Sequence, residues 1–253
     1  MSYSIVTGWY ADNKARDYRV LGDDFVRSVE CFDIWYHCIR SFTSPSNILI
    51  VDSASPARPR LPDDPRISWV SLKRNYGHAV QGHSALSGWS RALLLGLSYG
   101  YANGDHYTVL VEQGTLFHGK DIIERQIADH PEADIIAPSG SGTPQPLQTG
   151  ILIFRSAIIP KFVENYTRVA SADDALSPEK KVALAGNGMK IAFSNLLFGR
   201  RRPLDLSADH FFLRHGTLAE LHAFTARLGF GADLLPALTH QLVRLVENID
   251  LFL

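Results

Sequence analysis

Cysteine is scarce in this chain, which has only Cys31 and Cys38 among its 253 residues. The two lie seven residues apart in a stretch with helical periodicity, so their α-carbons are expected about 10 Å apart. That separation is too long for a disulfide, and no CxxC or histidine pair accompanies them to form a zinc site. We therefore expect two buried, reduced thiols.

A surplus of charge of either sign and a long apolar run are also missing. The formal net charge is −1 and the pI is about 6.8, so the chain lacks the basic footprint of proteins that bind nucleic acid or anionic membranes. No apolar segment approaches the roughly 20 residues that span a bilayer, and the first residues do not resemble a secretory signal. The sequence predicts a cytoplasmic protein with neither nucleic acid nor a membrane as partner.

What the sequence does have is the composition of a folded α/β protein, with 45% hydrophobic and 20% charged residues. Short apolar runs typical of strands alternate with longer helical patterns. We expect an α/β fold with an open, mostly parallel sheet flanked by helices. The expected strands are Tyr3–Gly8, Asn47–Asp52, Ile67–Leu72, Tyr107–Val111, Asp134–Ala137 and Leu147–Arg155. The expected helices between and after them are Asp24–Phe42, Ser87–Tyr101, Lys120–His130 and Ala157–Val169.

The last third of the chain has a mostly helical pattern. Ser177 and Pro178 form a typical helix start. The expected helices are Pro178–Leu197, Leu218–Leu228 and Leu234–Phe252. We predict one domain overall, with a sheet-containing core over residues 1–175 and a helical extension over 176–253. The apolar stripe of the last helix either packs on this core or pairs with a second copy in a homodimer.

Polar residues follow four of the predicted strands. In an open α/β sheet, ligands bind beyond the carboxyl ends of the strands, so these residues are candidates for a site. Each also has a plainer interpretation, because Asp52 could cap a turn and Arg74 could be a solvated loop residue. The candidates at these strand ends are Thr7, Asp52, Ser53, Arg74, Asn75, Glu112 and Gln113.

The order of several short motifs resembles that of the GT-A glycosyltransferases, especially glycosyltransferase family 2. Ile50–Ser55 matches the strand that ends in Val-Asp-Asp-Gly-Ser, and Asn75–Gly77 matches Asn-x-Gly. Ser90–Ala92 lies where the family often has Ala-Arg-Asn. Gly104–Tyr107 precedes a strand that ends in Glu112-Gln113-Gly114, where the family has Asp-x-Asp. The resemblance covers roughly residues 3 to 165.

The resemblance implies the Rossmann-like nucleotide-diphospho-sugar transferase fold and a role for each matching residue. Asp52 would read the base of the nucleotide, with Thr7 and Asn75 lining that pocket. Glu112 and Gln113 would face the ribose and diphosphate. Arg91 would reach the donor phosphates, although a helical arginine on a polar face is an equally good interpretation.

Gly114 departs from this pattern. In the family, the second acid of Asp-x-Asp binds Mn²⁺ or Mg²⁺, which bridges the donor diphosphate. Gly114 offers no ligand, and Glu112 alone is a poor site for a hard cation. Three explanations stay open. Arginines such as Arg74, Arg91 or the run at 200–202 replace the metal, the metal binds through Glu112 with a distant ligand such as His210, or the site is weakened.

Asp209 and His210 are the candidate catalytic residues, since a carboxylate or histidine would act as general base on the acceptor hydroxyl. With ten histidines in the chain, a chance cluster with a structural role is the favoured interpretation. Trp9 and Tyr10 follow the first strand and could stack on a base or sugar.

The sequence thus predicts a glycosyltransferase that moves a sugar from a nucleotide-diphosphate donor to a hydroxyl of a glycan, lipid or small acceptor. A sugar-phosphate nucleotidyltransferase is disfavoured, because it should have a Gly-rich loop and a basic residue after the first strand, whereas Thr7-Gly8-Trp9-Tyr10 has one glycine. An inactive nucleotide- or sugar-binding protein on the same scaffold is favoured by Gly114.

Overall fold

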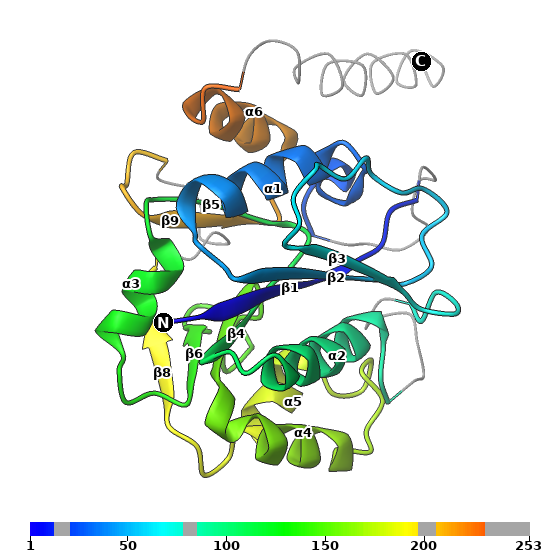
Figure 1. Cartoon of the computed structure of the whole chain (residues 1–253), viewed down its shortest axis with the longest axis vertical. Coiled ribbons are helices and arrows are strands. Elements are labelled where there is room, and N and C mark those ends of the chain that lie inside the picture. Colours follow the sequence, from blue (N-terminus) through cyan, green and yellow to red (C-terminus); the bar gives the residue numbers. More distant parts are fainter. Residues whose placement is uncertain (13–20, 78–84, 197–205, 231–253) are drawn as a thin grey trace.

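The chain folds around one seven-stranded sheet that lies between two layers of helices in a computed structural model (Figure 1). The structure describes residues 1–12, 21–77, 85–196 and 206–230. The α/β class and the mostly parallel sheet flanked by helices are as predicted.

The sheet has the strand order β3-β2-β1-β4-β7-β6-β8. Its parallel pairs are β3 with β2, β2 with β1, β1 with β4, and β6 with β8, whereas β7 runs antiparallel to both neighbours. The order of the strands reverses between β1 and β4, which is where open α/β sheets form their ligand crevice. The strands are β1 (Tyr3–Trp9), β2 (Asn47–Asp52), β3 (Ile67–Ser71), β4 (Tyr107–Val111), β6 (Ile135–Pro138), β7 (Ile151–Arg155) and β8 (Ile191–Ser194).

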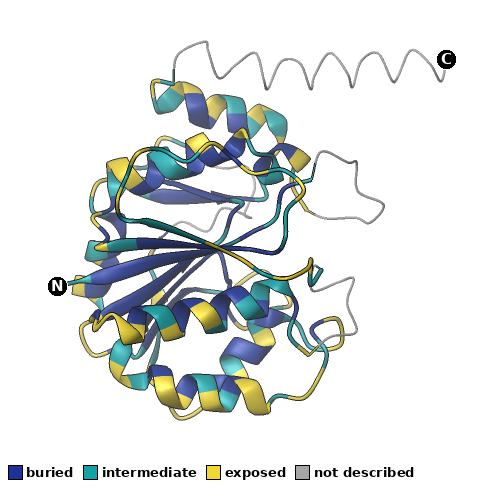
Figure 2. Cartoon of the chain, turned by 45° about the vertical axis from the view of Figure 1, so that its right-hand side comes forward, coloured by how far each residue is buried: buried dark blue, intermediate teal, exposed yellow. Residues whose placement is uncertain are grey.

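Three helices cover one face of the sheet: α2 (Gly88–Ala102), α4 (Ile159–Arg168) and α5 (Pro178–Ala185). The other face carries α1 (Cys31–Phe42), a two-stranded sheet of β5 (Thr115–His118) and β9 (Phe211–Arg214), and α6 (Leu218–Arg227) (Figure 1). The helix α3 (Ile122–Asp129) follows β5. Figure 2 shows buried residues along the central strands and exposed ones on the outer faces of the helices, which explains why the strand sequences are almost wholly apolar.

The helix α2 lies very close to the sheet because glycines face it. A β-carbon at Gly96 would stand 2.2 Å from Val6 Cγ1, and one at Gly100 would stand 2.1 Å from Thr108 Oγ1. Larger side chains at these positions would push α2 away from β1 and β4. Its first turn is thereby held next to the ends of those strands.

The predicted helix Asp24–Phe42 is two separate elements. A short 3₁₀ helix covers Asp24–Arg27. Its N-cap residue is Asp23, whose side chain accepts a hydrogen bond from the backbone of Phe25. The helix α1 starts only at Cys31. The two cysteines of α1 are free and buried, as expected.

The last third contains more strand than the sequence pattern indicates. The helix α5 ends at Ala185, and the chain turns through Gly188 in a left-handed conformation (φ +81°). The strand β8 then joins the main sheet beside β6, so the predicted helix Pro178–Leu197 is wrong beyond its first half. The helix α6 confirms the predicted Leu218–Leu228.

The predicted helix Leu234–Phe252 lies outside the described residues, as does the homodimer contact that it would make. The division at residue 175 stays a prediction, although β8 belongs to the same sheet as the strands before it. Within the described ranges, every helix is too short or too polar to cross a membrane.

Candidate functional site

The carboxyl ends of β1, β2 and β3 lie level with one another at one edge of the sheet. Trp9 is paired with Asp52, and Asp52 with Ser71. The end of β4 is joined to that of β1 across the point where strand order reverses, since the backbone N–H of Tyr10 donates to Gln113 Oε1 over 2.9 Å. The predicted strand-end residues therefore do converge on one edge.

Asp52 holds the loops at this edge together. Its Oδ1 accepts from the backbone N–H of Ser55 (3.0 Å) and from Ser55 Oγ (2.5 Å), and its Oδ2 accepts from Ser71 Oγ (2.9 Å). Ser55 Oγ in turn accepts from the backbone of Ala11 over 3.0 Å. Asp52 is 4% exposed, so its carboxylate acts as a structural link between three strand ends.

Ser53 and Asn75 shape the loop after β3. Ser53 Oγ accepts from the backbone of Tyr76 (3.1 Å), and Asn75 Oδ1 accepts from the backbone of Gly77 (2.8 Å). Asn75 is exposed. Thr7 is completely buried and its Oγ1 donates to the neighbouring Gly8 carbonyl, so it lies beneath the edge of the sheet.

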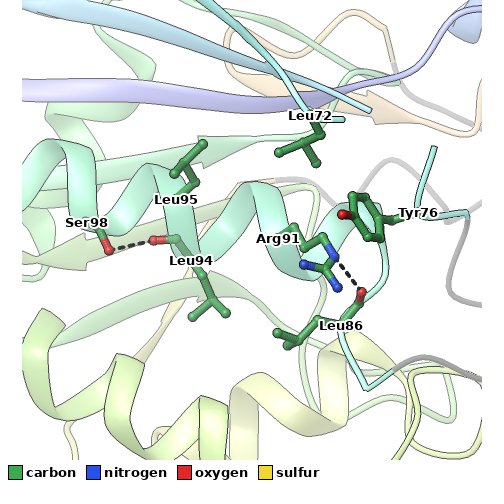
Figure 3. Close-up of a pocket in the computed structure, with 7 residues that line it drawn as sticks. All are labelled: Leu72, Tyr76, Leu86, Arg91, Leu94, Leu95 and Ser98. Atoms are coloured by element: carbon green, nitrogen blue, oxygen red, sulfur yellow. Dashed lines mark hydrogen bonds between the residues drawn. The ribbon is translucent and has the colours of Figure 1, made fainter. Parts of the chain in front are cut away.

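Arg74 and Arg91 meet at Tyr76. The Arg91 guanidinium lies 3.7 Å from the centre of the tyrosine ring and that of Arg74 lies 5.0 Å from it. Arg91 Nε also donates to the Leu86 carbonyl over 3.1 Å. Arg91 and Tyr76 stand at one end of an open pocket of about 340 Å³ beside α2 (Figure 3). Its lining comprises Leu72, Tyr76, Leu86, Arg91, Leu94, Leu95 and Ser98.

Glu112 is the polar centre of the site beyond β4, and its carboxylate is fully engaged. Its Oε1 accepts from Thr149 Oγ1 (2.6 Å), Trp89 Nε1 (3.0 Å) and the Arg214 guanidinium (3.0 Å). Its Oε2 lies 2.7 Å from the same guanidinium. This ion pair is largely buried, with Arg214 8% and Glu112 16% exposed at the side chain.

Arg214 is the site residue that sequence analysis missed. It is the last residue of β9, and pairing of Thr115 with Arg214 brings it beside the end of β4. Its guanidinium also donates to Gln148 Oε1 (3.2 Å) and Thr149 Oγ1 (3.0 Å), and it lies 3.9 Å from Glu179 of α5. No local motif marks it, because only the pairing of β9 with β5 reveals its position.

A second buried ion pair fixes the chain where it enters α2. Lys181 Nζ lies 2.5 Å from Asp173 Oδ1, and both side chains are completely buried. Lys181 also donates to the Ala85 carbonyl (2.7 Å), while Asp173 Oδ2 accepts from the backbone of Ser87 and from Ser90 Oγ (both 2.8 Å). The pair thus ties α5 to the turn that presents Trp89 to Glu112.

The backbone does not require a glycine at position 114. Gly114 is absent from the residues with positive φ, and an added β-carbon would make an ordinary contact of 3.4 Å with Val26 Cγ2. The metal that the resemblance implies would need further oxygen ligands beside Glu112. Among the described residues, no three histidine, cysteine, aspartate or glutamate side chains form a group that could hold one, so these residues do not fit the metal.

Asp209 and His210 lie away from Glu112. The pairing of His118 with Phe211 places them beyond the end of β5 opposite to Arg214, and a strand of four residues spans roughly 13 Å. His210 Nε2 donates to the Lys120 carbonyl over 3.0 Å. The structure therefore does not bring these two residues together with the strand-end site.

Two further predictions concern other residues near the strand ends. Trp9 is 1% exposed and packs edge-on against Phe32 at 5.2 Å and Trp35 at 6.5 Å, so the prediction that its ring stacks on a base or sugar is wrong. Tyr10 is partly exposed beside the site. The arginines at 200–202 lie outside the described residues.

Comparison with known proteins gives the fold. No family model matches the chain, and no curated protein matches its sequence. A putative glucose-1-phosphate thymidylyltransferase from Bacillus anthracis, solved with a sucrose, superposes with a TM-score of 0.52 at 11% identity. The match covers 89% of this chain and 94% of the other. The chain has a nucleotide-diphospho-sugar transferase fold.

Other solved structures resemble the chain over a smaller share. The mannosyltransferase PcManGT from Pyrobaculum calidifontis, solved with GDP-Man and Mn²⁺, has a TM-score of 0.46 at 13% identity, covering 76% of this chain and 54% of that one. The 4-diphosphocytidyl-2C-methyl-D-erythritol synthase of Anaerococcus prevotii has a TM-score of 0.45 at 13% identity, covering 76% and 85%. The assignment of the fold rests on the first superposition and on the strand order.

Proposed function

We propose that the chain is a glycosyltransferase that moves a sugar from a nucleoside-diphosphate donor to a hydroxyl group. The observation that carries this proposal is the buried polar cluster around Glu112, which lies at the carboxyl end of β4 where the strand order reverses. Ligands of open α/β sheets bind at that point. Asn75, which is exposed, and Arg91, which is partly exposed, extend the same edge with polar side chains.

In the proposed reaction, an acceptor hydroxyl attacks the anomeric carbon of the sugar while the bond from that carbon to the phosphate oxygen breaks. The nucleoside diphosphate leaves with an added negative charge, and the hydroxyl proton passes to a base. Glu179 is suited to take that proton. It is partly exposed at the start of α5, and its only side-chain partner among the described residues is Arg214 at 3.9 Å.

Nucleotide binding tests the first part of the proposal. Calorimetric titration of the whole chain with UDP, GDP, CDP, dTDP and their sugar conjugates should give binding to one base family. If none of these ligands binds at millimolar concentration, the transferase proposal fails. Binding without any transfer to water or to hydroxyl acceptors would instead support the non-catalytic alternative that Gly114 favours.

Glu179→Gln should lower the rate of sugar transfer about 100-fold or more while donor affinity changes little, because loss of a general base affects the chemical step. Asp209→Asn is the matched control, and we expect it to retain activity within about twofold, since Asp209 lies beyond the far end of β5. The measurement is kcat and KM for transfer or donor hydrolysis. The reverse result, with Asp209→Asn inactive and Glu179→Gln active, would assign the base to the Asp209 and His210 pair.

A further inference from the structure

We propose that this site binds the diphosphate of the sugar donor without a divalent cation. The guanidinium of Arg214 takes the place of the metal by donating a hydrogen bond to the diphosphate. The inference rests on the proposed function, because it concerns how the same donor is held. Glu112 is then a positioning residue for Arg214 and has no role as a metal ligand.

The Glu112 carboxylate is already paired with a cation, so a metal ion there would lie against the positive charge of Arg214. Three donors already approach Oε1, and the Arg214 guanidinium lies 2.7 Å from Oε2. A metal ion at Glu112 would have to displace this guanidinium. That would leave a largely buried arginine without its closest carboxylate, an arrangement that proteins strongly avoid.

The turn after β4 offers hydrogen-bond donors where a metal site would need acceptors. Gln113 Oε1 is occupied by the backbone of Tyr10, and Gln113 Nε2 is buried with no partner among the described residues. Arg214 Nε is likewise buried and without a partner there. N–H groups bind the oxygens of an anion and repel a cation, so this set of groups fits a phosphate.

Arg214 acts through its Nε–H, because its terminal nitrogens already donate to Glu112, Gln148 and Thr149 and its charge is shared by two carboxylates. Glu112 pairs with it at 2.7 Å and Glu179 lies 3.9 Å away. The guanidinium is held in place by Gln148 and Thr149 as well. A group fixed in this way loses no rotamer freedom when a diphosphate oxygen arrives, which is the condition for effective electrostatic stabilisation.

Titration with Mn²⁺ alone, followed by electron paramagnetic resonance, tests the metal side of the inference. The unmodified chain and Gly114→Asp should both leave Mn²⁺ free up to about 1 mM, since Glu112 stays paired with Arg214 in each. The double variant Gly114→Asp/Arg214→Met should gain Mn²⁺ binding through the freed Glu112 carboxylate and the introduced one. Mn²⁺ binding by the unmodified chain or by Gly114→Asp alone would overturn the inference.

Calorimetry with the nucleoside diphosphate that binds best tests the Arg214 side. The dissociation constant should be the same within about twofold in EDTA and in Mn²⁺. Glu112→Gln/Arg214→Met removes both charges and leaves no unpaired ion in that pair, and it should weaken binding about tenfold or more. Glu112→Gln, which keeps the guanidinium, should weaken binding less. Circular dichroism confirms that each variant is folded before it is measured.

The two proposals fail in different ways. If nucleotide binds only when Mn²⁺ is present, or if Glu112→Gln/Arg214→Met binds nucleotide as well as the unmodified chain, Arg214 does not replace the metal. The proposed function would still stand in that case. If no nucleotide binds in either buffer, the proposed function fails. In that case the Mn²⁺ titration still decides whether Glu112 is a metal ligand.

Discussion

Asp64 illustrates how a single side chain joins separate parts of this fold. It precedes β3 and accepts hydrogen bonds from Arg66 Nε (3.0 Å) and a terminal Arg66 nitrogen (2.7 Å), and from the Tyr36 hydroxyl of α1 (2.7 Å). The Arg66 guanidinium holds the pKa of the Asp64 carboxyl well below its usual range. The edge strand β3 is thereby fixed to the helix that covers it.

Asp64→Asn should lower the free energy of unfolding by about 0.5–1 kcal/mol at pH 7, a small value because the ion pair is partly exposed. The depressed pKa means that this stabilisation is present above the unfolded-state pKa of about 3.9 and is lost as the pH falls below it. The difference in free energy of unfolding between the unmodified chain and Asp64→Asn should therefore shrink as the pH falls from about 4 to about 2. Urea unfolding at several pH values measures it, and a difference that grows on acidification would contradict this account.

At the scale of single residues, the sequence identifies the strand-end groups but not what they do. Asp52 and Glu112 are both found from their position after an apolar strand, yet each is internally hydrogen-bonded in the structure. Arg214 gives no signal, because the four residues Phe211–Arg214 show only that a short apolar run precedes an arginine. Its partner Glu112 lies 102 residues earlier, and pairing at that separation depends on the tertiary fold.

Among the elements, α5 is joined to α2 through Asp173, which pairs with Lys181 of α5 and accepts hydrogen bonds from Ser87 and Ser90 at the start of α2. Both charged side chains are inaccessible to water, and removing one charge from such a pair leaves the other buried and uncompensated. The bond network reaches the backbone of Ser87, which is the N-cap residue of α2. The stability of the folded chain and the position of the first turn of α2 thus both depend on the ion pair of Lys181 and Asp173.

Lys181→Met should lower the free energy of unfolding by about 3–5 kcal/mol. Asp173→Asn/Lys181→Met removes both charges and should recover a substantial part of that loss, because no buried ion is left. Lys180→Met, at the exposed neighbouring position, serves as the control and should change the free energy of unfolding by about 0.5 kcal/mol or less. Equal stability of Lys181→Met and the unmodified chain would show that the pair does not hold these helices together.

The sequence predicts the strands that are continuous apolar runs well, and it misses three of the four-residue strands. The strands Asn47–Asp52 and Tyr107–Val111 have the predicted bounds, because both are continuous apolar runs between turn signals. The four-residue strands β5, β8 and β9 were not predicted. Runs this short have no resolvable period, and their partners lie far away along the chain.

For the molecule as a whole, the strand order is what places chemistry at one edge. The order reverses between β1 and β4, and ligands of open α/β sheets bind at that point. The local pattern predicts a mostly parallel sheet, but the antiparallel insertion of β7 between β4 and β6 follows from pairing across distant residues. The strand order therefore determines where the site lies, and Glu112 and Arg214 supply its charged groups.

A bound nucleoside diphosphate should stabilise the whole chain. At a ligand concentration 100 times the dissociation constant, linkage adds about 2.7 kcal/mol, which corresponds to a rise in Tm of roughly 5–10 °C for a chain of this size. The rise should be the same in EDTA and in Mn²⁺. Differential scanning fluorimetry measures it, and a rise that requires Mn²⁺ would count against the role given to Arg214.

The pairing of β5 with β9 also sets the time at which the site comes into existence during synthesis. Glu112 leaves the ribosome about 100 residues ahead of Arg214, and at about 5–20 residues per second this is an interval on the order of 5–20 s. Throughout that interval the strands β1 to β4 are available to pair, while the carboxylate at their edge has no counter-ion. The strands of the main sheet are therefore synthesised before the ion pair of Glu112 and Arg214 can form. Translation of β9 then completes both the two-stranded sheet and the site.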